Sequence, residues 1–397
     1  MISTPYHQSV ASTRTRSKAI RPLLSSVLWV ALGCGSVAAL AASAPGESET
    51  AITKAPALEN GNIIGRHIFG LARDFQNDPL AYQGKSLFYQ AQPTTLAVLS
   101  GDQKHALSIF DHEIGSVYIT HYDKENTLPV DTEALPLEDI DGLSRPSAPQ
   151  ITPWKTTMVS ETTLVNTADP ASFIDEFKYY YKNKPDLVNP YNYGWPAEII
   201  VLNAQGEAKV IKNFAMGRVS ASHIVILPDQ KTVYMLDTLH SNHLYAFIAK
   251  NAESMADGTL YVVNTQTDQP ELVELGDRSA LRVKFKLRKA DFSSFFQSSP
   301  PEQGNCATGF NAITTTFGNE CVKVVKKNAK YTGFMEPIRM AAVKGVNGLP
   351  GELLSMAYDS TNNQLILERK NKPAVKFPLF DNPQRNTRFS IEPAQAQ

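Results

Sequence analysis

Short apolar segments rich in β-branched residues recur along the chain, separated by turn residues at intervals of roughly ten residues. This pattern predicts an all-β protein with antiparallel strands, built as a sandwich, a barrel or a propeller. We favour a β-propeller, because it grows by adding four-stranded blades and therefore suits a long chain. No tight sequence repeat gives the number of blades. The predicted strands are residues 106–110, 156–160, 197–202, 209–215, 223–227, 232–236, 243–248, 258–264, 356–358 and 364–367, with turns at 203–206, 228–231 and 359–363.

Two short helical insertions are predicted beside the strands. Asp169-Pro170 begins the first, because proline is favoured in the first turn of a helix, and apolar or aromatic residues follow at helical spacing. We interpret the run Tyr179-Tyr180-Tyr181 as packing against the β-rich body rather than as a platform for stacking a ligand. The second helix is predicted over residues 336–343.

The N-terminus has the composition of a secretory signal peptide. A basic stretch that ends at Arg21 precedes an uncharged apolar stretch at residues 23–44. Ala39-Leu40-Ala41 is an A-x-A cleavage site, so we predict a signal peptide over residues 1–41 and a flexible segment over residues 42–60. No twin-arginine pair precedes the apolar stretch, which favours export in the unfolded state.

Two alternatives to cleavage stay open. The apolar stretch approaches the length of a transmembrane anchor, although its Ala, Gly and Ser content favours a signal. Leu32-Gly33-Cys34 resembles part of a lipobox, which would make the protein a lipoprotein attached through Cys34. In the favoured interpretation, the mature protein lies in the periplasm or is secreted, and it keeps no stable membrane span.

Composition indicates a folded globular protein without a nucleic-acid partner. Roughly 355 residues remain after cleavage, which is enough for a large core. The net charge of −1 gives no electrostatic basis for binding nucleic acid or anionic membranes. We expect a monomer.

Cysteine usage agrees with export. Of the three cysteines, Cys306 and Cys321 lie beyond the predicted signal peptide. An even pair in an oxidising compartment predicts a disulfide that closes a short loop and has a structural role. Metal binding by the pair is the alternative, but the spacing is wide and no His or Cys clusters nearby.

Polar residues at the ends of predicted strands are candidates for chemistry. Asp111-His112-Glu113 follows residues 106–110, and two carboxylates beside a histidine can ligate a hard cation or act in acid–base work. Glu161 follows residues 156–160. Both are also typical of a solvated strand end. Arg218 is able to pair with a carboxylate or with a phosphate oxygen.

Two further groups have a local spacing that suggests a site. Asp237, His240 and His243 lie in one loop at three-residue intervals, which is compatible with a metal site but does not force the side chains together. Glu336 and Arg339 lie one helical turn apart, where the simplest interpretation is an ion pair of little energy. The chain has no nucleophile elbow, P-loop or HExxH motif.

Over about residues 110–370, several short motifs in the same order resemble the PhoX-type alkaline phosphatase family. Each match is short, and the resemblance rests on the collinear set. The matching pieces are Asp111-His112-Glu113, Thr152-Pro153-Trp154 with Glu161, Asn192-Tyr193-Gly194-Trp195 with Glu198, Met216-Gly217-Arg218, the segment 233–247, the segment 257–262, and Phe334-Met335-Glu336 with Arg339.

This resemblance implies a six-bladed propeller that hydrolyses phosphate esters. The family uses an iron and calcium cluster in the central cavity, held by carboxylates and a cysteine thiolate, to polarise the phosphoryl group. Carried over to this sequence, the metal ligands would be Glu113, Glu161, Asp237 and Glu336, and Arg339 would hold the phosphate. These residues are sufficient for one or two Ca²⁺ ions.

Several family positions carry other residues here. Ser160 stands where the iron-binding cysteine is expected, and a hydroxyl is a far poorer iron ligand than a thiolate, so iron is not expected. Thr162 and Thr238 replace carboxylates. Ala221-Ser222 replaces a His-Glu pair, and Leu354 replaces a glutamate. Export in the unfolded state also disfavours a metal cluster that is assembled before export.

Two hypotheses follow for a phosphatase-like propeller domain over residues 61–397. In the first, the protein is a metal-dependent phosphoric monoester hydrolase with a reduced Ca²⁺ site, acting on a phosphorylated small molecule. In the second, it is a non-catalytic propeller that binds a ligand or partner. The missing ligands favour the second hypothesis, and the resemblance favours the first.

Overall fold

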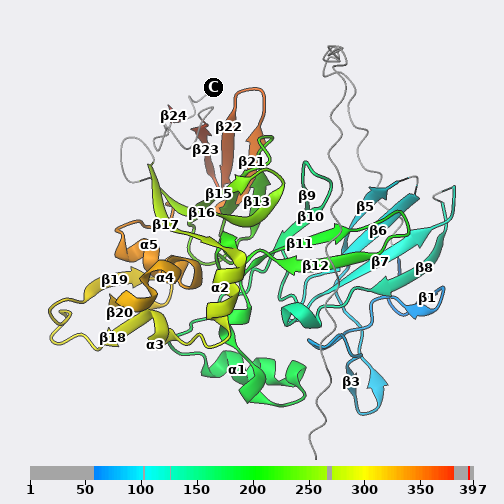
Figure 1. Ribbon diagram of the computed structural model, residues 1–397, viewed down its shortest axis with the longest axis horizontal. Coiled ribbons are helices and arrows are strands. Elements are labelled where there is room, and N and C mark those ends of the chain that lie inside the picture. The colour runs from blue at the N-terminus through cyan, green and yellow to red at the C-terminus, as the bar shows by residue number, and fades with distance from the viewer. Residues whose placement is uncertain (1–57, 102, 126, 266–270, 380–391, 394–397) are drawn as a thin grey trace, which may run out of the picture. The chain divides into compact units, whose positions relative to one another are not determined.

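A computed structural model describes residues 58–101, 103–125, 127–265, 271–379 and 392–393 (Figure 1). The predicted signal peptide, and the predicted flexible segment up to residue 57, lie outside these residues. No helix within the described ranges is long and apolar enough to cross a membrane. As predicted, the described chain is mostly β, and its strands form several small antiparallel sheets.

The first two larger sheets are antiparallel meanders, in which each strand pairs with the next along the chain. The first contains β5 (Thr94–Ser100), β6 (Gln103–Phe110), β7 (Ser116–Tyr122) and β8 (Pro129–Ala134). The second contains β9 (Gln150–Ile151), β10 (Thr157–Ser160), β11 (Pro196–Val201) and β12 (Ala208–Lys212). Two hairpins precede them, β1 (Ile63–Ile64) with β2 (His67–Ile68) and β3 (Ala81–Tyr82) with β4 (Lys85–Ser86).

Three more sheets follow in chain order. The third is a meander of β13 (His223–Ile226), β14 (Thr232–Leu236), β15 (Leu244–Asn251), β16 (Ser254–Asn264) and β17 (Glu271–Ser279). The fourth has β20 (Gly318–Val324) between β18 (Phe296–Ser299) and β19 (Asn311–Thr315). The fifth is a meander of β21 (Leu353–Asp359), β22 (Gln364–Arg369), β23 (Lys372–Pro378) and β24 (Glu392–Pro393).

Short helices lie in the connections between the sheets. Both predicted helices are confirmed: α1 begins directly after Pro170, and α5 begins directly after Glu336. The sequence patterns did not predict the other three. The helices are α1 (Ala171–Phe177), α2 (Ala280–Leu287), α3 (Phe292–Phe295), α4 (Ala329–Met335) and α5 (Pro337–Val343), with 3₁₀ turns at Glu138–Ile140, Lys178–Tyr181, Pro185–Leu187, Pro190–Asn192, Phe214–Met216 and Lys326–Asn328.

The third sheet is buried on both faces. Along β15, Tyr245 and Phe247 belong to one hydrophobic core, whereas Leu244, Ala246 and Ile248 belong to another. Because successive side chains of a strand point to opposite faces, a strand between two cores must be apolar at nearly every position. This explains why the segment has a continuous apolar sequence instead of an alternating one.

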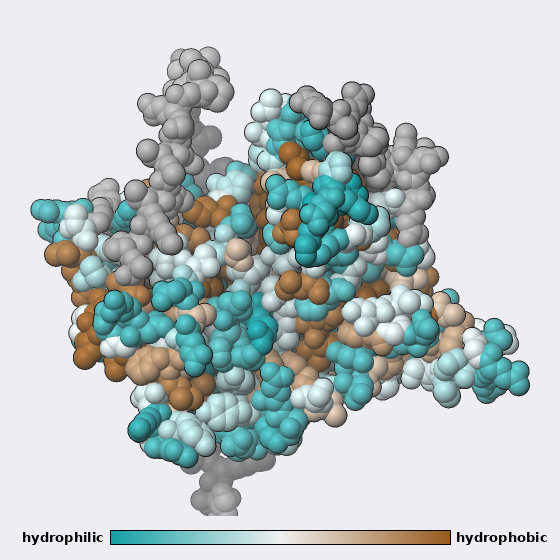
Figure 2. All heavy atoms as spheres, turned by 180° about the vertical axis from the view of Figure 1, so that it is seen from behind, coloured by the Kyte–Doolittle hydropathy of each residue, from teal (hydrophilic) through white to brown (hydrophobic). Residues whose placement is uncertain are grey.

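Neighbouring sheets share hydrophobic cores. Leu107 of the first sheet packs in the same core as Ile199 of the second, and Leu236 of the third packs in the same core as Leu365 of the fifth. The outer surface is mixed: hydrophobic and hydrophilic residues are interspersed over the face in Figure 2.

The strand predictions succeed best in the third sheet. The predicted strand 232–236 coincides with β14, and 223–227 overlaps β13 closely. The prediction for 209–215 is partly wrong, because β12 ends at Lys212 and the buried turn Phe214–Met216 follows. There the backbone of Asn213 leaves the extended region after its N–H bonds to the carbonyl of Pro196.

The predicted disulfide is confirmed. Cys306 and Cys321 are joined across a sequence separation of 15, with their Cα atoms 5.4 Å apart. Cys321 lies on β20, the middle strand of the fourth sheet, so the bond ties the loop between β18 and β19 to that strand.

Candidate functional site: the buried ion-pair network around Glu336

Glu336 lies at the break between α4 and α5. Its backbone leaves the helical region, with φ −130° and ψ 57°, and Pro337 starts the next helix. Proline is well suited to that first position because it lacks an N–H and has a fixed φ. Arg339 follows one turn later, and both side chains are buried, with 2% and 0% exposure for Glu336 and Arg339. The predicted ion pair is confirmed, with 2.8 Å between Arg339 Nη1 and Glu336 Oε2.

Arg339 has an acceptor for every one of its N–H donors. Its Nε and Nη2 donate to the two carboxylate oxygens of Glu320, at 2.8 and 2.9 Å. Its Nη1 donates to Glu336 and, at 3.4 Å, to the Thr167 hydroxyl, and its Nη2 also donates to Asn166 Oδ1 at 2.6 Å. A guanidinium has five N–H donors, so none remains for a phosphate oxygen.

Two aromatic rings also enclose this guanidinium. The centroid of the Phe317 ring lies 4.3 Å from Arg339 Cζ, and that of Phe292 lies 4.9 Å away. Burial alone would lower the pKa of Arg339, but the carboxylates of Glu336 and Glu320 outweigh burial and raise the pKa. Arg339 is therefore a permanent buried cation that is neutralised by the chain itself.

The second oxygen of Glu336 is occupied as well. Glu336 Oε1 accepts the hydroxyl of Thr167 and, at 2.5 Å, the hydroxyl of Tyr191. Burial and the Glu336 charge raise the pKa of Tyr191, so this phenol keeps its proton and acts as a donor.

Arg218 also belongs to the network and, unlike Arg339, has a buried nitrogen without an acceptor among the described residues. Of the two partners considered for it, a carboxylate lies nearby, with Arg218 Nη2 3.8 Å from Glu336 Oε1. Its Nε donates to the Met335 carbonyl at 2.9 Å, and Arg218 Cζ lies 5.1 Å from the centroid of the Tyr191 ring. Its Nη1 is buried without an acceptor among the described residues.

Glu161 forms a separate buried pair. Its Oε1 accepts from Lys212 Nζ at 2.9 Å and from the Ser144 N–H at 2.8 Å, and its Oε2 accepts from the Trp195 N–H at 3.1 Å. Lys212 also donates to the Asn192 carbonyl at 2.7 Å. Both side chains are almost fully buried, so this pair joins the ends of β10, β11 and β12.

Glu113 is held nearer the surface. It accepts from Arg145 Nη2, and its other oxygen lies 3.0 Å from His112 Nε2. The Glu113 side chain is 22% exposed and that of Arg145 47%, so solvent weakens this pair.

The Asp237 carboxylate stabilises its own loop through hydrogen bonds. Its two oxygens accept from the N–H groups of Leu239, His240 and Ser241 and from the side chains of His240 and Ser241, at 2.7 to 3.1 Å. His243 points elsewhere, with Nε2 3.4 Å from the Val346 carbonyl. The loop therefore brings His240, but not His243, to the carboxylate.

Each of these four carboxylates already has hydrogen-bond partners within the chain. Glu336 shares partners with Arg339, but Glu113, Glu161 and Asp237 each belong to a separate network. Within the described residues, no three His, Cys, Asp or Glu side chains form a group that could hold a metal ion. A Ca²⁺ ion takes six to eight oxygen ligands, and the oxygens here already accept hydrogen bonds from the chain. The Ca²⁺ assignment stays a prediction.

Sequence reasoning missed the partners that complete the network. Glu320, Thr167 and Tyr191 come from distant segments, and Thr167 is separated from Glu336 by 169 positions. Lys212, the partner of Glu161, was likewise missed. No local pattern signals such pairs; the only indication was that Lys212 lies inside a predicted strand, directly after Val210 and Ile211.

Comparison with known proteins gives distant structural likenesses only. No family model matches the chain, and no curated protein matches it. Among solved structures, the chain is similar to Pseudomonas fluorescens PhoX in complex with vanadate, a transition state analogue. The two sequences are 12% identical, the match covers 85% of this chain and 74% of that chain, and the TM-score is 0.44. A putative 6-phosphogluconolactonase from Bacteroides fragilis has 12% identity, coverages of 78% and 86%, and a TM-score of 0.24.

Proposed function

We propose that this protein is an exported, PhoX-like β-propeller that binds a ligand or partner and does not hydrolyse phosphate esters. The observation that carries the proposal is the occupation of all five N–H donors of Arg339 by acceptors of the chain. A residue that held a phosphate would need at least one donor free.

The arrangement of the carboxylates supports the same conclusion. Glu161 neutralises Lys212, and Glu336 neutralises Arg339, in places where each cation is buried. Removing one partner of such a pair leaves an uncompensated charge, which is strongly unfavourable. The positions that would hold metals in the family therefore serve here to join sheets and helices.

Two features support the remaining parts of the proposal. Consecutive antiparallel sheets of about four strands are the units from which a propeller is built, and residues 61–397 would form that single domain. The disulfide between Cys306 and Cys321 suits an oxidising compartment such as the periplasm.

Metal analysis of the purified protein, followed by an assay with p-nitrophenyl phosphate with and without Ca²⁺, tests the proposal. We expect no stoichiometric metal and no turnover above the blank. Ca²⁺-dependent turnover by the wild-type protein would overturn it, and its loss in Glu336→Gln and Glu161→Gln samples that are still folded would assign it to these carboxylates. Glu352→Gln is the matched control, because Glu352 forms an exposed pair with Lys370.

A reduced-site phosphatase is the second candidate, and one observation favours it. The buried Nη1 of Arg218 has no acceptor among the described residues, and a phosphate oxygen would supply one. In that case, inorganic phosphate would raise the melting temperature of the protein, and Arg218→Lys would abolish the effect. Absence of any shift in the wild-type protein would remove this candidate.

A further inference from the structure

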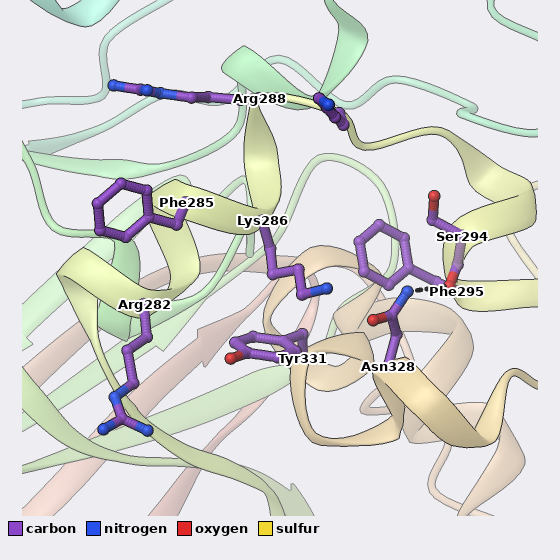
Figure 3. Close-up of a pocket in the computed structure, with 9 residues that line it drawn as sticks. Arg282, Phe285, Lys286, Arg288, Ser294, Phe295, Asn328 and Tyr331 are labelled. Carbon is purple, nitrogen blue, oxygen red and sulfur yellow. Dashed lines mark hydrogen bonds between the residues drawn. The ribbon is translucent and has the colours of Figure 1, made fainter.

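A basic pocket that contains no residue of the Glu336 network opens between α2, α3 and the start of α4 (Figure 3). Its volume is about 510 Å³, which is enough for a small organic molecule. The residues that line it are Arg282, Phe285, Lys286, Arg288, Lys289, Ser294, Phe295, Asn328 and Tyr331.

The local sequence explains why the cations gather there. Val283 and Leu287 of α2 are buried in the main core, four positions apart on one face of the helix. Arg282, Phe285 and Lys286 occupy the other side of the helix and line the pocket. A helix that buries one face thus presents its charged positions together on another.

The pocket carries uncompensated positive charge. Four of its lining residues are cations, and none of its lining residues is acidic. Within the described chain, none of these four forms an ion pair with a carboxylate. Lys250, by contrast, pairs with both Asp257 and Asp277. Because the whole chain has a net charge of only −1, this concentration of positive charge is a local feature.

Lys286 and Tyr331 define the inner part of the pocket. Lys286 extends from α2 towards Tyr331 and Asn328 (Figure 3), and its Nζ lies 5.4 Å from the centroid of the Tyr331 ring. Lys330 and Arg278 also approach this ring, at 5.6 and 6.0 Å. Several cations thus lie around one ring, and an anion bound beside it would offset part of their charge.

Polar and aromatic groups accompany the charges. Asn328 is buried and fixed by donating its Nδ2 hydrogen to the Ser294 carbonyl at 2.8 Å. Phe285 is 60% exposed, although large aromatic side chains are usually buried, and Arg288 lies 5.6 Å from its ring centroid. The pocket therefore offers cations for an anionic group and an exposed ring for a flat apolar group.

We propose that this pocket binds a small organic anion with two or more negative charges and a flat ring, of the nucleoside phosphate class. Lys286 and Arg288 bind the phosphate groups by charge-assisted hydrogen bonds, and the ring packs on Phe285. The inference rests on the proposed binding function and supplies its ligand class. Binding here and turnover at the Glu336 network are measured separately, so either one can fail without the other.

Isothermal titration of the purified protein with ADP tests the proposal. Adenosine supplies the ring without the charge, and inorganic pyrophosphate the charge without the ring. We expect one ADP site, weaker binding of pyrophosphate, no binding of adenosine, and loss of ADP affinity as salt is raised. No ADP binding, or adenosine binding as tightly as ADP, overturns the proposal.

Lys286→Gln keeps most of the side-chain length and removes the charge. We expect it to weaken ADP binding roughly tenfold, as the loss of about one charge-assisted hydrogen bond. Lys372→Gln, at an exposed position of β23, should bind ADP like the wild type. Equal ADP affinity in Lys286→Gln and the wild type overturns the assignment. A vesicle sedimentation assay gives a second outcome that overturns the assignment. If the protein binds phosphatidylglycerol vesicles through Lys286 but does not bind ADP, the basic surface is assigned to a membrane.

Discussion

Arg339 and Glu320 form a two-pronged ion pair, in which Nε and Nη2 of the guanidinium bond to both oxygens of the carboxylate, at 2.8 and 2.9 Å. The pair joins α5 to β20, the strand that also carries Cys321 of the disulfide. The Arg339 side chain is fully buried, while that of Glu320 is 17% exposed. One buried side chain thus connects a helix junction to the fourth sheet.

Arg339→Lys should destabilise the protein although it keeps the charge. Lysine has three donors on one nitrogen and cannot bond to Glu320 through two nitrogens at once. We expect a loss of about 3 kcal/mol in the free energy of unfolding, from the charge-assisted hydrogen bonds that disappear. Urea denaturation measures it. Arg66→Lys is the control, because the Arg66 side chain is 86% exposed; equal stability of the two variants would contradict the prediction.

Glu161→Gln should be far more damaging than Glu113→Gln. The first leaves the Lys212 ammonium, whose side chain is 1% exposed, without a counterion, and we expect a loss of about 3 to 5 kcal/mol. The second affects a pair whose Arg145 is half exposed, and should cost under about 1 kcal/mol. Thermal and urea unfolding compare them.

Replacing Lys212 as well tests the reason for that loss. Lys212→Met removes the buried charge, so the double variant with Glu161→Gln should recover part of the stability that Glu161→Gln alone loses. If the two single losses simply add, Glu161 and Lys212 are not coupled as the 2.9 Å distance between them indicates.

Much of the third sheet could be predicted from sequence, because β13, β14 and β15 are largely apolar runs. Residues 232–236 were placed correctly since Thr232–Leu236 is buried throughout and bounded by turn residues. The fourth sheet could not be predicted from sequence, because its strand Asn311–Thr315 is exposed at most positions and contains few apolar residues. Its strands contribute single apolar side chains such as Ile313 and Val322 to the main core, and pairing to β20 and the disulfide hold them as well.

The candidate site shows the same division between local and distant contacts. The Glu336–Arg339 pair was predicted because its spacing of one turn is local. The burial of the pair was not predicted, and neither was Glu320, because the energy of the pair depends on segments that only the fold brings together. An exposed pair at that spacing would contribute little to the free energy of folding, whereas removing one partner of a buried pair strongly destabilises the protein.

Loss of the disulfide should weaken the fourth sheet first. A bond across 15 positions restricts the unfolded chain, and its removal costs about 3 kcal/mol in the chain-entropy description. We expect dithiothreitol to lower the melting temperature and to speed hydrogen exchange in β19 and β20 before other strands. A variant with Cys306→Ser and Cys321→Ser should already have the lower melting temperature and should not respond to dithiothreitol. An unchanged melting temperature on reduction would show that the sheet does not need the bond.

His105 should make stability depend on pH. It is buried on β6, its Nε2 lies 3.2 Å from the Ala204 carbonyl, and its Nδ1 is buried without a partner in the described chain. The ring of His121 lies 5.0 Å away on β7. If Nε2–H donates to the carbonyl, protonation would place a second N–H where it finds no acceptor. Burial is the main cause that lowers the pKa of His105, and His121 adds to it.

The sign of the effect follows from the lowered pKa. An unfolded histidine titrates near pH 6.5, so below that pH the unfolded chain binds a proton that folded His105 excludes. The contribution of His105 to stability is therefore complete above about pH 6.5 and is lost as the pH falls towards its lower folded pKa. His105→Gln keeps a donor for Ala204 and cannot titrate, so urea denaturation between pH 7.5 and about pH 5 should show a smaller loss of stability for the variant than for the wild type. Parallel pH profiles for the two proteins would mean that His105 does not titrate differently in the folded and unfolded states.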